Sequence, residues 1–180
     1  MTASSDSRST NLPNPGSRTG AVLVTGTTSG VGLNAVKALT DRGWTVVTAN
    51  RDPIRAGAAA DSLGIPREKL HHIRMDLGDL DSVRVGVETL VDSLGFGLDA
   101  LVINAAVYKP RLKEPERSPQ GYELSMATNH LGHFLLIQLL LPQLQASQHP
   151  SKRVVILGTC LLYTSPSPRD VEESRMPSSA

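Results

Sequence analysis

The sequence predicts an α/β fold in which helices cover both faces of a doubly wound, mostly parallel sheet. Short β-branched runs alternate with longer amphipathic runs, and that alternation is typical of βαβ units. A glycine-rich turn over residues 25–32 joins the first apolar run to the first amphipathic run. With 180 residues, of which 39% are hydrophobic, the chain is long enough to bury one core.

Composition excludes several classes of protein. The formal net charge of +1 and an aromatic content of 3% argue against a nucleic-acid partner. The single cysteine cannot form an internal disulfide. Polar residues interrupt the most apolar stretch at His130, His133 and Gln138, so no run is expected to be long enough to span a membrane.

The first half of the chain predicts two strand–helix pairs. Residues 21–25 form a near-continuous apolar run, as expected of a strand that is buried on both faces. A helix is expected over 30–42, followed by a second strand over 45–50 and a short alanine-rich helix from 53 to about 64. The residues expected to face the core from the first helix are Val31, Ala35 and Leu39.

The middle of the chain predicts a third pair. A strand is expected over 70–74, and a helix is expected to begin after Asp79 or Asp81. The apolar positions of this helix are Val83, Val87, Leu90, Val91 and Leu94.

The last part predicts a fourth strand, a long helix and a fifth strand. The strands are expected over 101–103 and 153–157, and the helix is expected from about residue 121 until Pro142 kinks or ends it. Its core-facing stripe is expected to be Tyr122, Met126, Phe134, Ile137 and Leu141.

Both ends of the chain differ from this pattern. Residues 1–19 are rich in Ser, Thr, Asn, Pro and Gly, and they are expected to form a disordered tail without the apolar segment of a secretory signal. Residues 160–170 and 174–180 both resemble the translation of a sequencing-library adapter in one reading frame, with Val171–Glu173 as a variable index between them. A natural Ser/Pro-rich tail is the alternative. The domain is therefore expected over 20–159, incomplete after the fifth strand.

The glycine turn predicts a phosphate-binding loop. Gly26 would allow a sharp turn, Gly30 would allow close approach of a ligand, and Gly32 would let the helix pack near the strand. The free N–H groups at the start of the helix would then face a pyrophosphate. A plain tight turn is the alternative.

The spacing Gly-x3-Gly-x-Gly resembles that of the short-chain dehydrogenase/reductase family, whose fold is of the Rossmann type. Asp76-Leu77, Asn104-Ala105-Ala106 and Asn129 match further motifs of that family after the third strand, after the fourth strand and in the long helix. The resemblance implies strand order 3-2-1-4-5 and a nicotinamide cofactor. The residues expected to bind the cofactor are Gly26, Thr28, Ser29, Gly30, Val31, Gly32, Asn50, Arg51, Asp76, Leu77, Asn104, Ala105 and Ala106.

The end of the second strand predicts which cofactor is preferred. A carboxylate at this position would accept the ribose hydroxyls of NADH, but this chain has Asn50-Arg51 there. A guanidinium suits a 2′-phosphate, so NADPH is the expected cofactor. A solvated loop cation is the alternative for Arg51.

Longer segments resemble one branch of the family, the light-dependent NADPH:protochlorophyllide oxidoreductases, especially cyanobacterial forms. They are Asn104–Pro110 and Tyr122–Phe134, together with Gly30–Leu33, Gly43-Trp44 and Ile156–Thr159. This resemblance implies protochlorophyllide as substrate and light-driven reduction of its C17–C18 double bond in chlorophyll biosynthesis.

The resemblance also implies catalytic residues. Asn129 matches the asparagine that holds a water in the proton relay, with stabilisation of a helix kink as its alternative role. Thr159 matches the position of the catalytic serine. The family's Tyr-x3-Lys pair is not found: Tyr163 lies in the adapter-like segment and is followed by Ser167 where the lysine would fall. The chain itself is therefore expected to be an inactive fragment.

Three further residues invite a functional interpretation. Tyr108 could approach the pigment or pack in its loop. His130 and His133 suggest a metal site, but packing or hydrogen-bonding roles are favoured because nothing supplies the other ligands.

Two alternative functions remain open. One is another NADPH-dependent short-chain reductase acting on a ketone or retinoid, and the other is a non-catalytic nucleotide-binding fragment. The expected location is the cytoplasm or the thylakoid periphery of a cyanobacterium, with a plastid less favoured. Peripheral association with a photosynthetic membrane and oligomerisation are possible for the full-length protein.

Overall fold

The structure, a computed structural model, describes residues 20–93, 97–109, 114–150 and 152–158. The expected tail over 1–19 and the adapter-like segment over 160–180 lie outside these residues. The described part contains one five-stranded sheet in the order β3-β2-β1-β4-β5, and all neighbouring strands are parallel. The predicted fold class and strand order are confirmed.

The strands lie close to their predicted positions. They are β1 (Ala21–Thr25), β2 (Thr45–Asn50), β3 (Leu70–Arg74), β4 (Ala100–Ile103) and β5 (Arg153–Ile156). Every residue of β1 and β2 is buried, as expected for central strands of a sheet that is covered on both faces.

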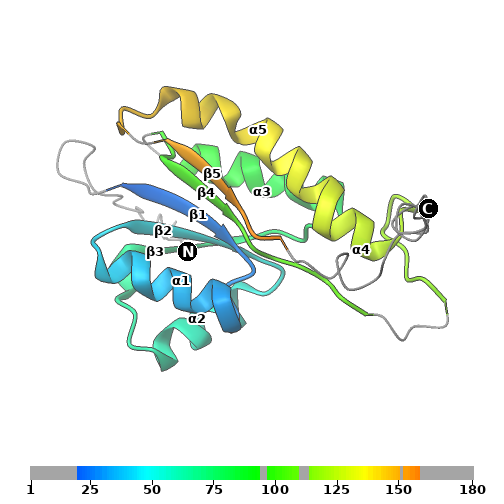
Figure 1. The fold of residues 1–180 in the computed structure, drawn as a ribbon, viewed down its shortest axis with the longest axis horizontal. Coiled ribbons are helices and arrows are strands. Elements are labelled where there is room, and N and C mark those ends of the chain that lie inside the picture. Colours follow the sequence, from blue (N-terminus) through cyan, green and yellow to red (C-terminus); the bar gives the residue numbers. More distant parts are fainter. Residues whose placement is uncertain (1–19, 94–96, 110–113, 151, 159–180) are drawn as a thin grey trace, which may run out of the picture.

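The helices form two layers (Figure 1). Helices α1 (Gly30–Asp41) and α2 (Pro53–Ser62) cover one face, and α3 (Leu80–Ser93) and α5 (Gly132–Ala146) cover the other. Two apolar clusters fill the spaces between the layers. One contains Val22, Val36 and Val46 on the α1 side, and the other contains Leu101 and Leu136 on the α5 side.

The buried face of α1 differs from the prediction by one residue. Gly32, Val36 and Thr40 face the sheet, whereas Val31 is 66% exposed. The reason is close packing: a β-carbon on Gly32 would collide with the carbonyl oxygen of Gly26. The helix therefore presents its smallest residue to the strand, and the apolar pattern alone does not reveal this.

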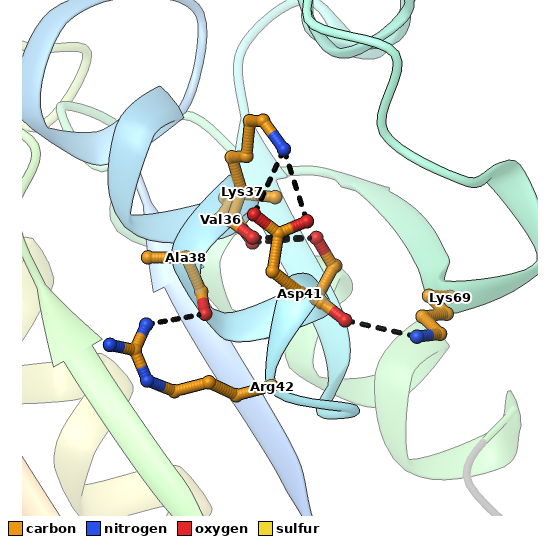
Figure 2. Close-up of polar contacts among 7 residues, drawn as sticks. Val36, Lys37, Ala38, Asp41, Arg42 and Lys69 are labelled. Carbon is orange, nitrogen blue, oxygen red and sulfur yellow. Dashed lines mark hydrogen bonds and ion pairs between the residues drawn. The ribbon is translucent and has the colours of Figure 1, made fainter.

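The carboxyl end of α1 is fixed by side chains (Figure 2). Arg42 Nη1 donates to the Ala38 carbonyl at 2.9 Å, and Lys69 Nζ donates to the Thr40 carbonyl at 3.0 Å. Lys37 and Asp41 form an exposed ion pair one turn apart. Cations at this end satisfy free carbonyl groups and complement the helix dipole.

The long helix has three parts. A short α4 (Leu124–Met126) leads into a π-helical turn (Ala127–Leu131), and α5 continues from there through Pro142. The sequence predicted that Pro142 would kink or end the helix. The helix does not end there, because it runs on to Ala146.

The predicted stripe of this helix is wrong at four of its five positions, and the fifth, Ile137, is half-buried against the core. Leu136, Leu140 and Leu144 are buried, whereas Phe134 is 57% exposed and Tyr122, Met126 and Leu141 are exposed as well. The π turn adds a residue, so positions before and after it do not continue one stripe. The helix is also apolar on most sides, so the sequence pattern could not identify its inner face.

This long helix also tests the prediction that the chain contains no apolar run long enough to span a membrane. Among the described residues, the helical stretch Leu124–Ala146 is long and apolar enough to cross a bilayer by length and composition. The expectation that no such run exists is therefore wrong. Its leucines at 136, 140 and 144 pack into the core beneath the sheet, as in the core helix of a globular domain.

Candidate functional site

The candidate site lies at the carboxyl ends of the strands, where β1 separates the two halves of the sheet. This edge is the usual ligand-binding position in doubly wound folds. The loop after β1 turns at Gly26, whose φ of +70° lies in the left-handed region that favours glycine. Gly30 also has a positive φ, +59°, and nothing lies within 4 Å of where its β-carbon would be.

The amino end of α1 is free to bind an anion. Ser29 precedes the helix but its side chain makes no capping hydrogen bond, and the first turn contains no acidic residue. The first N–H groups of the helix thus lack the usual side-chain acceptor and carry the positive end of the dipole. A phosphate would accept hydrogen bonds from these N–H groups and would interact favourably with the positive end of the dipole.

Thr25 and Asn104 fix the position of the loop. Thr25 Oγ1 accepts from the N–H groups of Asn104 at 2.9 Å and Ala105 at 3.0 Å. Asn104 Nδ2 donates to the carbonyl oxygens of Thr25 and Gly26, both at 2.9 Å. The end of β4 therefore acts as a rigid support for the end of β1.

Asn50 supports the same loop from β2. It is buried, its Oδ1 accepts from the Thr27 N–H at 2.8 Å, and its Nδ2 donates to Thr27 Oγ1 at 2.8 Å. Its amide is thus engaged in holding the loop. The adjacent cation, Arg51, is exposed.

These segments surround one cavity of about 440 Å³. Twelve of the thirteen residues predicted to bind a cofactor line it, and Gly30 does not. The complete lining is Gly26, Thr28, Ser29, Val31, Gly32, Ala49, Asn50, Arg51, Asp52, Arg55, Met75, Asp76, Leu77, Asn104, Ala105, Ala106, Val107 and Thr128.

Two guanidinium groups lie at the β2 side of the cavity. Arg51 was predicted there, and Arg55 in the first turns of α2 is added by the structure. Both residues are exposed, and within the described ranges no ion pair joins either of them to a carboxylate. Asp52, between them, caps α2 by accepting from the Arg55 N–H at 3.0 Å.

Asp76 and Leu77, which follow β3, also line the cavity. Asp76 Oδ1 accepts from the Gly78 N–H at 2.9 Å and so fixes this turn. Helix α5 touches the turn through Gly132, where an added β-carbon would collide with the Leu77 carbonyl.

Asn129 lies in the π turn beside the cavity. Its Oδ1 accepts from the Val107 N–H at 2.7 Å, and its Nδ2 donates to the Val107 carbonyl at 2.8 Å. These two bonds join the π turn to the segment after β4, and π turns frequently lie at functional sites. Thr159 lies outside the described residues, and Tyr108 is 70% exposed beside the loop.

The two histidines have different surroundings. His133 is buried, with Nε2 at 3.2 Å from Thr25 Oγ1 and Nδ1 at 3.2 Å from the Asn129 carbonyl. Burial lowers the pKa of His133, which favours the neutral ring. His130 is exposed and its ring stacks against Phe134. In the part of the chain that the structure describes, no group of three metal-ligating side chains occurs.

Sequence reasoning missed Arg55, Val107, Thr128, Gly132 and the contacts of His133. An arginine one helical turn after Arg51 was a usable signal for Arg55, because both lie near the same strand end. Nothing local in the sequence indicates the others, since their roles depend on contacts between distant segments.

Curated proteins that are similar to this chain include protochlorophyllide reductases of plants. The chain is 51% identical over 143 residues to the chloroplastic protochlorophyllide reductase of Daucus carota and 50% identical over 143 residues to that of Cucumis sativus. In each case the match covers 79% of this chain and 36% of the relative. The chain thus spans little more than a third of the length of these relatives.

Solved structures give the same fold. The RhlG/NADP active-site complex of Pseudomonas aeruginosa matches with a TM-score of 0.66 and 28% identity, covering 79% of this chain and 56% of that one. The NADPH-bound carbonyl reductase from chicken fatty liver matches with a TM-score of 0.58 and 26% identity, covering 72% of this chain and 53% of that one.

These relatives correct the predicted location. The cyanobacterial assignment, with its cytoplasmic or thylakoid-peripheral location, is contradicted because the relatives found here are named as chloroplastic proteins of plants. The resemblance of Asn104–Pro110 and Tyr122–Phe134 did not separate cyanobacterial from plastid forms.

The family follows from the match of a whole domain. The sequence profile of the short chain dehydrogenases matches residues 20–159, which include all five strands and the entire lining of the cavity. The chain therefore belongs to the short-chain dehydrogenase family.

Proposed function

We propose that residues 20–159 form the cofactor-binding part of an NADPH-dependent reductase. The uncapped amino end of α1 would hold the pyrophosphate, and Asp76 and Leu77 would lie against the adenine side. Arg51 and Arg55 would bind the 2′-phosphate, because two guanidinium groups that form no ion pair among the described residues favour a doubly charged anion over ribose hydroxyls. When bound, this cofactor supplies a hydride.

We propose further that the substrate of the full-length protein is protochlorophyllide, reduced at its C17–C18 double bond with light. The observation that carries this proposal is the 51% identity over 143 residues to a relative named protochlorophyllide reductase. It includes the segments that first indicated this branch of the family, Asn104–Pro110 and Tyr122–Phe134.

Specific residues would serve this reaction. Asn129 would hold the π turn and, through it, the proton relay, while Thr159 would supply a hydroxyl near substrate and nicotinamide. Tyr108 is exposed beside the cavity, where it could contact a large planar pigment.

The remaining proposals concern the chain and its surroundings. The segment over 160–180 is proposed to derive from an adapter, and the chain as it stands is proposed to be inactive because it lacks the Tyr-x3-Lys pair. A plastid location follows the names of the relatives. Peripheral membrane association and oligomerisation of the full-length protein remain proposals.

Cofactor binding is tested by fluorescence titration of the chain with NADPH and NADH. Arg51→Glu is expected to weaken NADPH binding about 10- to 100-fold, because it removes a charge-assisted contact and adds repulsion. NADH binding should change by less than about twofold. Arg84→Glu, an equal charge change on the exposed side of α3, is the control and should alter neither. An unchanged NADPH/NADH ratio in Arg51→Glu would refute the 2′-phosphate assignment.

The reaction is tested by illumination. The coding sequence recovered across codon 159 from intact genomic DNA is expressed, mixed with NADPH and protochlorophyllide, and illuminated while the red absorption of chlorophyllide is followed. Product from that protein and none from the 180-residue chain is expected. Turnover by the 180-residue chain would overturn the inactive-fragment proposal, and no product from either would overturn the substrate assignment.

A further inference from the structure

Hydrogen bonds and short backbone segments together form a closed ring that passes through His133. It joins the end of β1, the segment after β4 and the π turn, three parts of the chain that are distant in sequence. Its members are Thr25, Asn104, Ala105, Val107, Asn129 and His133.

The hydroxyl of Thr25 determines the direction of the first bond. Its oxygen accepts from two N–H groups, those of Asn104 and Ala105, which occupies both lone pairs. Only the hydroxyl proton remains for His133, whose Nε2 lies 3.2 Å from Thr25 Oγ1. Thr25 therefore donates, and Nε2 accepts.

This direction fixes the form of the imidazole. Because Nε2 accepts, the ring proton must lie on Nδ1, which is 3.2 Å from the carbonyl oxygen of Asn129 and donates to it. A protonated ring would carry a hydrogen on Nε2 facing a Thr25 oxygen that has no lone pair left. The burial of His133, with 4% of its surface exposed, favours the same neutral form.

Asn129 completes the ring. Its side chain holds Val107 through both the N–H and the carbonyl, so the segment from Asn104 to Val107 is fastened at both ends. Asn104, Ala105, Ala106 and Val107 all line the cavity, whereas His133 does not.

We propose that His133 is a positioning residue that, as the neutral Nδ1–H tautomer, aligns the Asn104–Val107 wall of the cofactor site with Asn129. It acts on the ligand only through Thr25 and Asn129. The part of this inference that concerns the cofactor rests on the proposed function, and the part that concerns the ring stands on geometry alone.

The tautomer is tested on the whole chain labelled with 15N-histidine by magic-angle-spinning NMR, with the His133 signals identified by their loss in His133→Phe. At pH 7.5 one protonated Nδ1 and one unprotonated Nε2 are expected. In Thr25→Val the Nε2 signal should shift, and in Thr25→Ser, which keeps the hydroxyl, it should not. A protonated Nε2, or no response to Thr25→Val, would overturn the proposal.

The positioning role is tested by amide exchange and NADPH titration of His133→Phe, which keeps an aromatic ring but removes both bonds. Exchange of the Ala105 and Val107 amides should accelerate about tenfold, and the NADPH dissociation constant should rise about three- to tenfold. His130→Phe, the same change on the exposed face, is the control and should alter neither.

If His133→Phe unfolds, amide exchange and NADPH binding are compared between Thr25→Val and Thr25→Ser, which change the other end of the Thr25–His133 bond. Unchanged exchange in folded His133→Phe, or equal effects of the two Thr25 variants, would overturn the positioning role. If the unmodified chain fails to bind NADPH, the proposed function falls, while the tautomer and exchange results still decide the role of His133.

Discussion

The two ends of the parallel sheet are held by different kinds of hydrogen bond. At the amino end, Asp99 is fully buried and accepts from the Ala21 N–H at 2.6 Å and from the Ser147 hydroxyl. A single carboxylate thereby ties β1, the start of β4 and the end of α5. At the carboxyl end, Thr25 and Asn104 tie the loops to one another, but the first N–H groups of α1 and the guanidinium groups of Arg51 and Arg55 are left without side-chain or ion-pair partners among the described residues.

This difference separates stability from binding. The Ala21 N–H and the Ser147 hydroxyl at the amino end are satisfied within the protein, so a change to their shared acceptor should mainly cost folding free energy. Polar groups at the carboxyl end that have no internal partner are available to a ligand. Changes among them should mainly affect binding, except where they disturb the framework that supports the loops.

The largest effect is expected at the amino end. Asp99→Ala leaves the Ala21 N–H and the Ser147 hydroxyl buried without this acceptor, and it should lower the free energy of unfolding by about 2–5 kcal/mol. Urea unfolding measures the change. Asp92→Ala, on the exposed side of α3, is the control and should stay within about 0.5 kcal/mol. Equal stability of the two variants would show that the amino end of the sheet does not depend on Asp99 for its stability.

A framework glycine at the carboxyl end should cost both stability and binding. A β-carbon on Gly32 would collide with the Gly26 carbonyl and crowd Asn104 Nδ2 at 2.5 Å. Gly32→Ala should therefore lower the free energy of unfolding by about 1–3 kcal/mol and abolish NADPH binding.

Gly57→Ala provides the matched control for Gly32→Ala. It is also a helical glycine, but its β-carbon would meet only His72 Nε2 at 3.7 Å. This substitution should stabilise the chain by about 0.5–1 kcal/mol and leave binding unchanged. If the two alanine variants bind NADPH equally well, the close approach at Gly32 is not required.

Acid should lower the free energy of unfolding through His133, which joins the end of β1 to the π turn. Burial lowers the pKa of His133 from the model-peptide value of 6.5, so the unfolded chain binds a proton more readily than the folded chain. This contribution to stability is complete above pH 6.5 and is lost as the pH falls through the lowered pKa. Urea unfolding from pH 8 to 5 should show the decline, and His133→Phe should show a shallower one. An identical pH dependence in both would assign the effect to His71 and His72, whose pKa values burial also lowers.

The smallest effect is expected from the second cation. Arg55→Ala should raise the NADPH dissociation constant by about two- to fivefold, because the residue is exposed and its charge is screened. It should leave NADH binding and urea stability unchanged. A loss as large as that of Arg51→Glu would mean that the two guanidinium groups act as one binding unit.

The sequence predicted features that depend on local pattern. Buried parallel strands, glycine turns and the residues after each strand are all local features. The motifs among them carried the resemblance to the family, and that resemblance implied the sheet order and most of the cavity lining. Arg51 was placed at the cavity for the same reason, because a strand end is fixed by its own residues.

Features that depend on contacts between elements were not predictable in this way. The inward face of α1 is decided by the contact of Gly32 with Gly26, and the inward face of α5 follows from a π turn that one sequence does not reveal. The role of His133 requires that Thr25 and Asn129 be known to lie beside it. Each of these contacts joins segments that no periodicity relates.

The strand order 3-2-1-4-5 has a consequence for the growing chain during translation. Strands β1, β2 and β3 can assemble once residue 74 has left the ribosome, but one edge of the wholly buried β1 then waits for β4. That edge is covered about 30 residues later, which at ordinary rates of synthesis takes on the order of a few seconds. Throughout this interval an apolar strand with free backbone groups is open to pairing with another nascent chain. The position of β1 at the centre of the sheet, which creates the ligand site, thus also leaves an unpaired strand edge at an intermediate stage of synthesis.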